Sequence, residues 1–229
     1  MREIVFDTET TGLSFDAGHR LAEIGCVELV NRVETGRTFH AYLNPERPMP
    51  AEAQRIHGLS DAFLSDKPLF ASVVHDFLAF IGDDPLVAHN AAFDFGFLNG
   101  ELTQAGLVPV AMDRMVDTLA IARVKHPGSK HSLDALCTRY GIDRSLRTFH
   151  GALLDAQLLA QVYVELTGGR QIDLVLRTEE VESAAQLAAI RPAEVRPPRN
   201  FDVPADELER HASFVADLKD PLWIKGSSG

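Results

Sequence analysis

The stretch REIVFDTETTGL, Arg2 to Leu13, ends a strand-like run with two acids one residue apart. Alternate side chains of a strand share a face, so Asp7 and Glu9 lie on the side of Val5, and the even-numbered residues lie on the other side. If both faces of the sheet are covered, these two acids are at least partly buried. The elements around this strand therefore decide what the acids can do.

Two more strand patterns follow the first one closely. Residues Glu3 to Asp7, Arg20 to Leu29 and Thr38 to Leu43 have strand composition, and the turn-rich segments SFDAGH and NRVETG connect them. Short connections between consecutive strands predict a three-stranded antiparallel meander.

After Pro50 the pattern changes to helices that alternate with short strands. PLVAHN indicates a short buried strand, and MVDTLAIARV combines a last strand with the start of a helix. Helices are predicted in FASVVHDFLAFIG, from about Ala91 to Ala105, in SLDALCTRYG with Ser132 as N-cap and Gly141 as stop, and in GALLDAQLLAQVYVEL, which ends at Gly168 and Gly169. The predicted fold class is α/β, with a mixed five-stranded sheet (the meander plus parallel strands) flanked by helices.

The regular pattern ends near Gly169, which predicts a domain at 1–169 and a flexible tail at 170–229. The tail contains IRPAEVRPPRN, a proline-rich and extended linker. Beyond it, DELERHASFVADLKDPLW fits one amphipathic helix with Leu208, Ala212, Val215 and Leu218 on one face. The final GSSG resembles a linker scar more than folded protein.

Composition argues against several classes of protein. No apolar run approaches the roughly 20 residues of a membrane span, and no signal peptide opens the chain, so we expect a cytoplasmic protein with no membrane partner. Cys26 and Cys137 lack a metal-type spacing, which argues against a disulfide framework or a zinc site.

Charge argues against nonspecific binding of nucleic acid. The 22 basic and 33 acidic residues give a net charge of −11, so a polyanionic substrate would need local basic side chains. Such side chains gather between Ile121 and His150: Arg123, Lys125, Lys130, Arg139, Arg144 and Arg147. Without other signals, a solvated surface is the simpler interpretation of this group.

Two further acids fall on apolar helix faces. Asp94 shares a stripe with Leu98 and Leu102, and Asp155 aligns with Val162 and Leu166. One such acid alone would more often be capped, hydrogen-bonded or on the surface. Four core-facing carboxylates, Asp7, Glu9, Asp94 and Asp155, would repel one another, so they must be protonated, paired or bound to cations. Oxygen ligands without cysteine or a histidine pair favour hard ions such as Mg²⁺ or Mn²⁺.

His150 stands five positions before Asp155, at the start of the last helix pattern. A lone histidine is usually structural or exposed, but this one would lie beside the carboxylates. A neutral imidazole can take a proton from a water molecule at working pH. Two metal ions, four carboxylates and one base make a hydrolytic phosphodiester site.

Taken together, FDTETTGL, HNAAFD and HGALLDA resemble the DEDDh family of 3′-to-5′ exonucleases, which have an RNase H-like fold. The segments HRLAEIGCVEL, FHAYLNPER, IHGLSD, SLDALCTRYGID and RTFHGALLDAQLLAQVYVELTGG are similar to the proofreading (epsilon) subunits of bacterial DNA polymerase III. The resemblance covers about Arg2 to Gly169.

The resemblance implies a role for each matching residue. Asp7, Glu9, Asp94 and Asp155 would hold two Mg²⁺ (or Mn²⁺) ions, with Asp7 shared, and His150 would be the general base. The substrate-binding residues would be Thr8, Thr10, Leu13, His57 and Asn90, at the 3′ end of a frayed or single-stranded DNA. The product would be a nucleoside 5′-monophosphate. Phe93 and Phe97 flank Asp94 and could contact bases, although core packing explains at least one of them.

The tail contains two segments that resemble binding motifs for replication partners. QIDLVL, at 171–176, is similar to the peptide with which bacterial replication proteins bind the sliding clamp (beta), and its contact residues would be Gln171, Asp173, Leu174 and Leu176. A plain linker is the alternative. The segment at about 205–225, with Phe214, Leu218, Leu222 and Trp223, resembles the end that binds the polymerase (alpha) subunit.

Three hypotheses remain at this point. The first is a proofreading exonuclease of the replicative polymerase. The second is a DEDDh exonuclease that processes RNA, which would share the site and lack the two tail motifs. The third is a scaffold without activity, against which the competent residues at all five catalytic positions argue.

Overall fold

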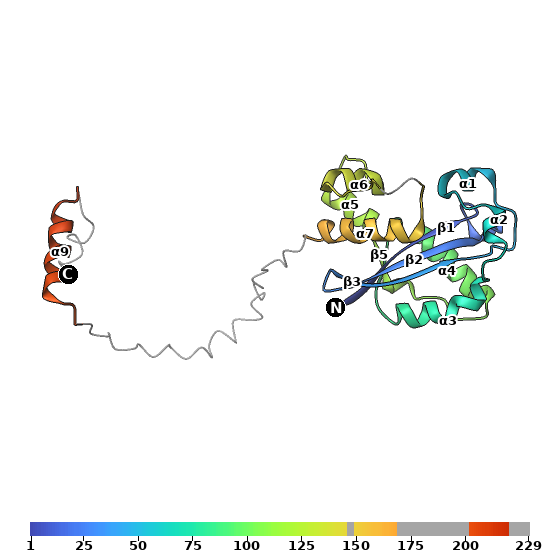
Figure 1. The fold of residues 1–229 in the computed structure, drawn as a ribbon, viewed down its shortest axis with the longest axis horizontal. Helices are drawn as coiled ribbons and strands as arrows, with labels where there is room; N and C mark the ends of the chain where they lie inside the picture. The colour runs from blue at the N-terminus through green and yellow to red at the C-terminus, as the bar shows by residue number, and fades with distance from the viewer. Residues whose placement is uncertain (146–148, 169–201, 220–229) are drawn as a thin grey trace, which may run out of the picture. The chain divides into compact units, whose positions relative to one another are not determined.

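We describe the computed structural model of the chain over residues 1–145, 149–168 and 202–219. These residues form two units, which are treated separately (Figure 1): an α/β unit that ends at residue 168, and the helix α9, Ala205–Ala216. The clamp-peptide prediction at 171–176, the linker, Leu222 and Trp223 lie outside the described residues.

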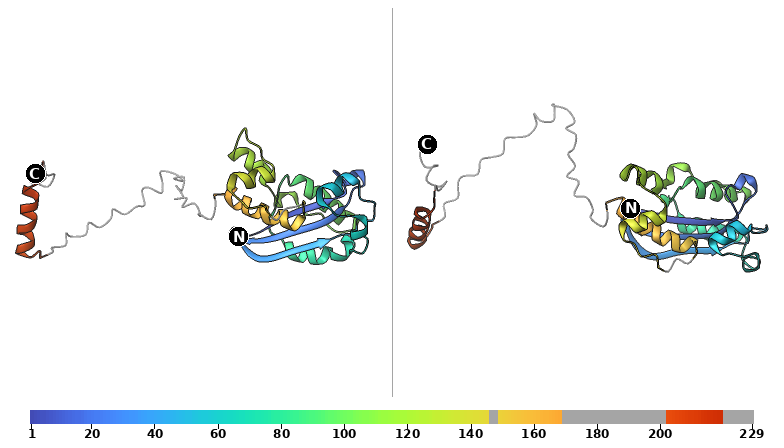
Figure 2. Two further views of the ribbon diagram at one scale, coloured as in Figure 1. Left: turned by 45° about the horizontal axis from the view of Figure 1, so that its top comes forward. Right: turned by 90° about the horizontal axis from the view of Figure 1, so that it is seen from above.

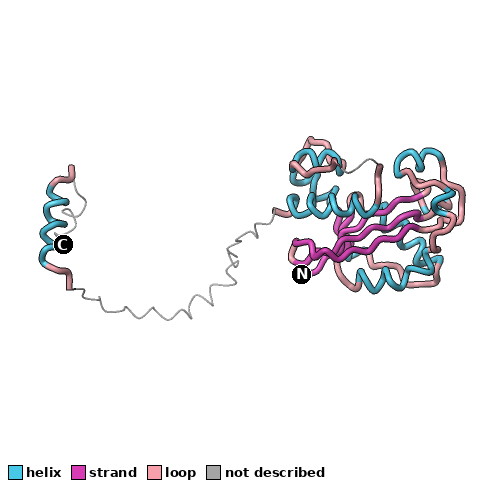
Figure 3. Tube along the Cα trace, in the orientation of Figure 1, coloured by secondary structure: helices cyan, strands magenta, loops and turns pink. Residues whose placement is uncertain are grey.

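The sheet has five strands in the order β3-β2-β1-β4-β5. Their bounds are β1 Arg2–Thr10, β2 Leu21–Val30, β3 Val33–Tyr42, β4 Leu86–Ala88 and β5 Met115–Asp117. Strands β1, β2 and β3 pair antiparallel, whereas β1, β4 and β5 pair parallel. Figure 3 shows the strands side by side in magenta. The predicted mixed five-stranded sheet is confirmed.

The turn between β2 and β3 is shorter than predicted. NRVETG was expected to be a connection, but β3 begins at Val33, and the turn consists of Asn31 and Arg32 with φ of 51° and 64°. Two residues with positive φ match the twist of a tight hairpin. The prediction was wrong because the first residues of β3 are exposed on both sides, so they carry no apolar alternation.

Seven helices are described in the α/β unit: α1 Ala51–His57, α2 Asp61–Leu64, α3 Phe70–Ile81, α4 Ala92–Gln104, α5 Thr118–Lys125, α6 Leu133–Tyr140 and α7 Ala152–Leu166. Short 3₁₀ turns lie at Phe15–Ala17 and Met112–Arg114. The predicted boundaries of α6 are confirmed, since the Ser132 hydroxyl caps it and Gly141 ends it with φ of 66°. Across the residues described, none of the helices has the length and apolar character of a membrane span.

Helices cover both faces of the sheet, as predicted. The side of Ile4 and Phe6 packs against α3 and α4, and the side of Val5 packs against α7. Figure 2 shows α7 running along the sheet beside β1 and β2. Helices α5 and α6 pack on α7 through Ala122, Leu136 and Cys137. The acids of β1 that lie on the side of Val5 therefore face α7.

Candidate active site

The candidate site lies where the parallel strands end. Strand β1 ends at Thr10, and β4 ends at Ala88, shortly before α4 begins at Ala92. In open α/β sheets, loops and helix N-termini at this edge form the usual place for a ligand. Asp94 and Asp155 both lie in the first turn of a helix, α4 and α7 respectively, where the helix dipole favours a negative charge.

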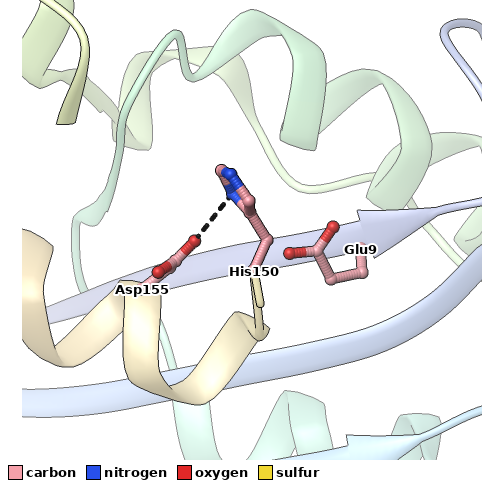
Figure 4. Close-up of side chains that lie close together, drawn as sticks. All are labelled: Glu9, His150 and Asp155. Atoms are coloured by element: carbon pink, nitrogen blue, oxygen red, sulfur yellow. Dashed lines mark ion pairs between the residues drawn. The ribbon is translucent and has the colours of Figure 1, made fainter. Parts of the chain in front are cut away.

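Three side chains from distant parts of the sequence converge at this edge. Glu9, His150 and Asp155 each place one ligand atom so that all three atoms lie within 4.8 Å of one another (Figure 4). Glu9 and Asp155 are 8% and 2% exposed, whereas the side chain of His150 is 48% exposed. The cluster therefore has a buried acidic floor and a basic group that solvent can reach.

The contact between His150 and Asp155 orients the imidazole ring. His150 Nδ1 lies 3.2 Å from Asp155 Oδ2. In the neutral ring, a proton on Nδ1 donates to the carboxylate and places the proton-accepting lone pair on Nε2. The backbone N–H of His150 donates to the carbonyl of Ile56 at 3.2 Å, so the end of α1 also holds this residue. An imidazole oriented by a carboxylate in this way is chemically suited to accept a proton.

A glycine allows α7 to reach the sheet. A Cβ atom at Gly25 would lie 2.2 to 2.3 Å from backbone atoms of Ala152 and Leu153, closer than any side chain permits. Gly25 pairs with Asp7 across β1 and β2. The first turn of α7 therefore packs directly on the sheet beside Asp7, and this packing brings Asp155 to the cluster.

Asp94 is held from the other face of β1. Its Oδ1 accepts a hydrogen bond of 2.7 Å from the hydroxyl of Thr8. Burial, together with the nearby charge of Asp117, raises the pKa of Asp94 to about 7, although the hydrogen bond from Thr8 opposes this. Because the folded protein holds this carboxylate at such cost, a bound cation would be its natural counter-charge.

Asp7 lies on the same face as Glu9 and is half-buried. Neither Asp7 nor Asp94 belongs to the tight cluster of Glu9, His150 and Asp155 found among the described residues. The predicted burial of Glu9, Asp94 and Asp155 is confirmed. A set of buried carboxylate oxygens fits hard divalent ions.

In the predicted nucleotide-binding segment, two threonine hydroxyls form hydrogen bonds within the protein, whereas Leu13 is exposed. The hydroxyl of Thr8 donates to Asp94, and that of Thr10 donates to the carbonyl of Gly12 at 2.6 Å, so both stabilise the site from within. Leu13 is 86% exposed at the rim. Phe97 packs in the core, and the half-buried Phe93 contacts its ring.

His57 has a buried ring nitrogen, and Thr10 and His150 are among its electrostatic neighbours. Its Nδ1 accepts a hydrogen bond from the N–H of Leu59 at 3.0 Å, which places the proton of the neutral ring on Nε2. That Nε2 atom is buried without a hydrogen-bond partner among the described residues. Burial lowers the pKa of His57, although the Thr10 backbone and the Glu23 carboxylate partly oppose this.

Asn90 begins the connection from β4 to α4 with φ of 63°, and the Asp117 carboxylate accepts hydrogen bonds from the backbone N–H groups of Asn90 and Ala91. Asparagine tolerates this left-handed conformation better than most residues. Asp117 therefore shapes the turn that precedes Asp94, a role that the sequence analysis missed.

A further buried acid beside the cluster was also missed. Glu23 is 2% exposed, pairs directly with Glu9 across β1 and β2, and lies 2.7 Å from His40 Nε2. Residues directly opposite on antiparallel strands share a face, so Glu23 lies beside the cluster. The signal available was an acid inside the otherwise apolar run LAEIGCVEL, but its position depends on the register between strands.

Comparison with known proteins places the chain in a family. The exonuclease family model RNase_T matches residues 4–163. The DNA polymerase III subunit epsilon of Rickettsia felis is 48% identical, over 95% of this chain and 97% of that protein. The chain belongs to the exonuclease family of DNA polymerase III epsilon subunits. The subunit of Escherichia coli K12 is 51% identical over 74% of this chain and 72% of its own length.

Solved structures share this fold. Exonuclease X in complex with 5′-overhanging duplex DNA has a TM-score of 0.59 at 26% identity and covers 72% of this chain and 90% of its own. The nuclease domain of 3′hExo, a DEDDh family member bound to rAMP, has a TM-score of 0.62 at 21% identity, over 72% of this chain and 91% of its own. The fold is thus the RNase H-like fold of the DEDD exonucleases, which are typically metal-dependent.

This membership decides among the three hypotheses. Epsilon subunits are the 3′-to-5′ proofreading exonucleases of DNA polymerase III, and the match extends through most of the chain. The proofreading hypothesis is therefore confirmed, and the RNA-processing and scaffold hypotheses are set aside.

Proposed function

We propose that this epsilon subunit removes mispaired 3′-terminal nucleotides by hydrolysis that depends on two divalent ions, and that it releases nucleoside 5′-monophosphates. The observation that carries this mechanism is the convergence of Glu9, His150 and Asp155 at the end of β1. A buried acidic floor beside an accessible imidazole is suited to hydrolysis of a phosphodiester.

The residues proposed to hold the ions are Asp7, Glu9, Asp94 and Asp155. Their oxygen donors favour Mg²⁺ or Mn²⁺. When bound, the ions would make an attacking water more acidic and offset the charge on the leaving 3′ oxygen. The hydroxyl of Thr8 would keep Asp94 in place throughout, because its hydrogen bond does not involve the substrate.

His150 is proposed as the general base. Its contact with Asp155 orients the ring through Nδ1, so that Nε2 would accept the proton of the attacking water. The hydrogen bond to Ile56 fixes the backbone from which this side chain extends. The same residue is the most exposed member of the cluster, which suits proton exchange with solvent.

Five residues are proposed to bind the terminal nucleotide: Thr8, Thr10, Leu13, His57 and Asn90. Leu13 offers exposed apolar surface for a base. The unsatisfied Nε2–H of His57 would donate a hydrogen bond to an oxygen of the nucleotide, since a buried donor without a partner costs about 1–3 kcal/mol. Thr8 and Thr10 act mainly by shaping the segment.

Selection of errors would follow from fraying. A mispaired terminus unstacks more readily, so a site that accepts single strands captures it more often without recognising the mismatch. A polymerase partner would supply such termini at high local concentration.

The proposed contact with the alpha subunit is the segment at about 205–225, and the proposed contact with the beta clamp is 171–176. Helix α9 supports the first assignment, because its Leu208 and Phe214 and the nearby Leu218 are exposed apolar side chains. The clamp residues Gln171, Asp173, Leu174 and Leu176 lie outside the described residues.

A primer with a labelled, mispaired 3′ terminus tests the proposed mechanism. We expect release of the labelled nucleoside 5′-monophosphate with Mg²⁺ and none with EDTA. Asp7→Ala and Asp155→Ala should each lower the rate by at least about 10³-fold, because they remove charge needed in the transition state. Asp76→Ala, which changes an exposed acid on α3, is the matched control.

His150→Ala tests the base. We expect a rate loss of about 10²- to 10⁴-fold and a changed pH–rate profile. An unchanged profile in this variant, or full activity in either aspartate variant, would reject the assigned roles.

A further inference from the structure

The outer side of the α/β unit carries exposed basic side chains with little compensation by acids. Arg123 lies on α5, Lys130 lies in the connection to α6, and Arg139 lies near the end of α6, and all three are exposed. We call these three residues the α5–α6 basic surface. We propose that it binds phosphates of the substrate DNA strand on the 5′ side of the nucleotide being removed.

The charge of this surface is not neutralised locally. Among the residues described, no acid lies within ion-pair distance of Arg123 or Lys130, and Arg139 donates to the hydroxyl of Ser129 at 2.9 Å, which leaves its charge uncompensated. The nearby Asp134 already pairs with Arg144 at 2.7 Å. In a chain with a net charge of −11, a local excess of positive charge is the exception.

Neighbouring histidines experience this positive field. Burial lowers the pKa of His126, and the charges of Arg139 and Lys125 lower it further. Burial also lowers the pKa of His89, and the charge of Arg123 lowers it slightly more, although a hydrogen bond to the His131 backbone and the charge of Asp117 oppose this. Both directions are those expected where cations crowd a neutral imidazole.

The surface begins close to the catalytic edge. His89 follows β4 directly, and its Nδ1 lies 2.9 Å from the hydroxyl of Thr118, at the start of α5. Asp117, the N-cap of α5, acts electrostatically on both His89 and Asp94. Arg123, in the last turn of α5, also acts electrostatically on His89, so this histidine links the catalytic edge to the α5–α6 basic surface. Figure 1 shows α5 and α6 together on one side of α7.

Phosphodiester backbone is the ligand that fits this surface. A strand whose 3′ end occupies the site must leave the acidic floor, and each further phosphate gains from a nearby arginine or lysine. Arginine can also bind a phosphate through two hydrogen bonds. This inference rests on the proposed function, since it requires the strand end to bind at the carboxylates.

The test separates strand binding from chemistry with two substrates. The full chain carrying Arg123→Gln, Lys130→Gln and Arg139→Gln is compared with a control that loses the same charge elsewhere, at the exposed Arg37, Arg55 and Arg210. One substrate is a single-stranded oligodeoxynucleotide. The other is the p-nitrophenyl ester of thymidine 5′-monophosphate, which has no phosphate beyond the scissile one.

We expect the KM for the oligonucleotide to rise about tenfold in the first variant, with unchanged kcat. The slope of log KM against log salt should fall by about 2, since each single-strand phosphate contact contributes about 0.7. Hydrolysis of the ester should stay within about twofold of the unmodified chain. Equal KM and equal salt slope in the two variants would show a merely solvated surface and overturn the inference.

Failure of the proposed chemistry has a different signature, because the unmodified chain would then leave the ester intact with Mg²⁺. If the triple variant loses ester hydrolysis and the control variant does not, its active site is damaged. The three single variants are then measured in its place. Each is expected to raise the oligonucleotide KM about two- to threefold and to lower the salt slope by about 0.7. Three single variants that all match Arg55→Gln would reject the inference.

Discussion

At the scale of single residues, Asp94 is a carboxyl group whose burial strongly disfavours its charged form. Its pKa is raised from 3.8 to about 7 because burial disfavours the charged form. The unfolded chain loses this proton near pH 4, whereas the folded protein keeps it until about pH 7. Without metal, the free energy of unfolding therefore falls as pH rises between these values and levels off above pH 7.

Asp94→Asn should remove this pH dependence. A shift of about 3 units corresponds to on the order of 4 kcal/mol, and an asparagine oxygen can still accept the hydrogen bond from Thr8. We expect urea denaturation in EDTA to show a smaller stability difference between pH 5 and pH 8 in this variant, together with loss of nuclease activity.

Asp76→Asn, on the exposed side of α3, is the matched control and should behave like the unmodified chain. If Asp94→Asn and the unmodified chain lose stability equally from pH 5 to pH 8, the buried carboxylate is not the source.

The sequence predicted the buried acids well, because their burial follows from the periods of a strand and a helix. The period of a strand puts Asp7 and Glu9 on one face, and the period of a helix puts Asp155 on the apolar stripe, so only neighbours in the chain are needed. The pairing of Thr8 with Asp94 and the position of Glu23 beside Glu9 required contacts between distant segments. Strand register fixes those contacts, and no local pattern encodes it.

The approach of α7 to the sheet is the main determinant of the site at the scale of elements. The first turn of α7 packs on Gly25, so that Asp155 and His150 lie at the end of β1. The closeness of this contact follows from the missing side chain. The helix position is therefore sensitive to a single added carbon.

Gly25→Ala should displace α7 and misalign the cluster. Overpacking typically costs about 1–3 kcal/mol, and a displacement of about 1 Å in an active site can cost about 10²-fold in rate. We expect a lower melting temperature and at least a tenfold slower hydrolysis of the thymidine ester, and both are directly measurable.

Gly96→Ala provides the contrast in stability, because a Cβ at this exposed position of α4 meets nothing within 4 Å. It should raise the free energy of unfolding by about 0.5–1 kcal/mol through helix propensity. Full activity and stability of Gly25→Ala would show that the contact does not position the site.

Elements with a strong period were predicted from the sequence, as were the short strands β4 and β5, whereas the short helices α1 and α2 and the exposed start of β3 were not. Helix α7 has an apolar stripe over its whole length, and α6 has both of its caps. Helices α1 and α2 are too short to show a period, yet α1 brings His57 to the site and accepts the hydrogen bond from His150. The functional part of α1 was found only through the family resemblance of IHGLSD.

The α/β unit accounts for the buried core at the scale of the whole molecule. The four clusters of buried apolar residues draw on side chains no later than Leu166. Stability and chemistry should therefore reside in this part, and partner binding should reside in the remainder.

A chain ending at residue 169 is expected to keep its fold and its chemistry. Its free energy of unfolding should lie within about 1 kcal/mol of the full chain, because the core clusters of the described residues contain no side chain beyond Leu166. Hydrolysis of the thymidine ester should change less than about twofold, while copurification with the polymerase subunit and the clamp should be lost. Calorimetry and gel filtration with purified partners measure these outcomes.

Replacement of Gln171 and Leu174 by alanine in the full chain should weaken clamp binding alone. Unchanged clamp affinity would reject the peptide assignment, and loss of ester hydrolysis on truncation would move the domain boundary. The tail is where sequence patterns said least about structure, because six residues of QIDLVL carry no period and their meaning depends on a partner surface.

The order in which the catalytic groups occur along the chain has a consequence for biosynthesis. Glu9 is translated among the first residues, on a strand that ends in the middle of the sheet, whereas Asp155 arrives with the last helix of the α/β unit. A nascent polypeptide lacks Asp155 until the last helix is made, and a partly opened copy does not hold it beside Glu9. We therefore expect hydrolysis of DNA to begin only when the α/β unit has folded completely.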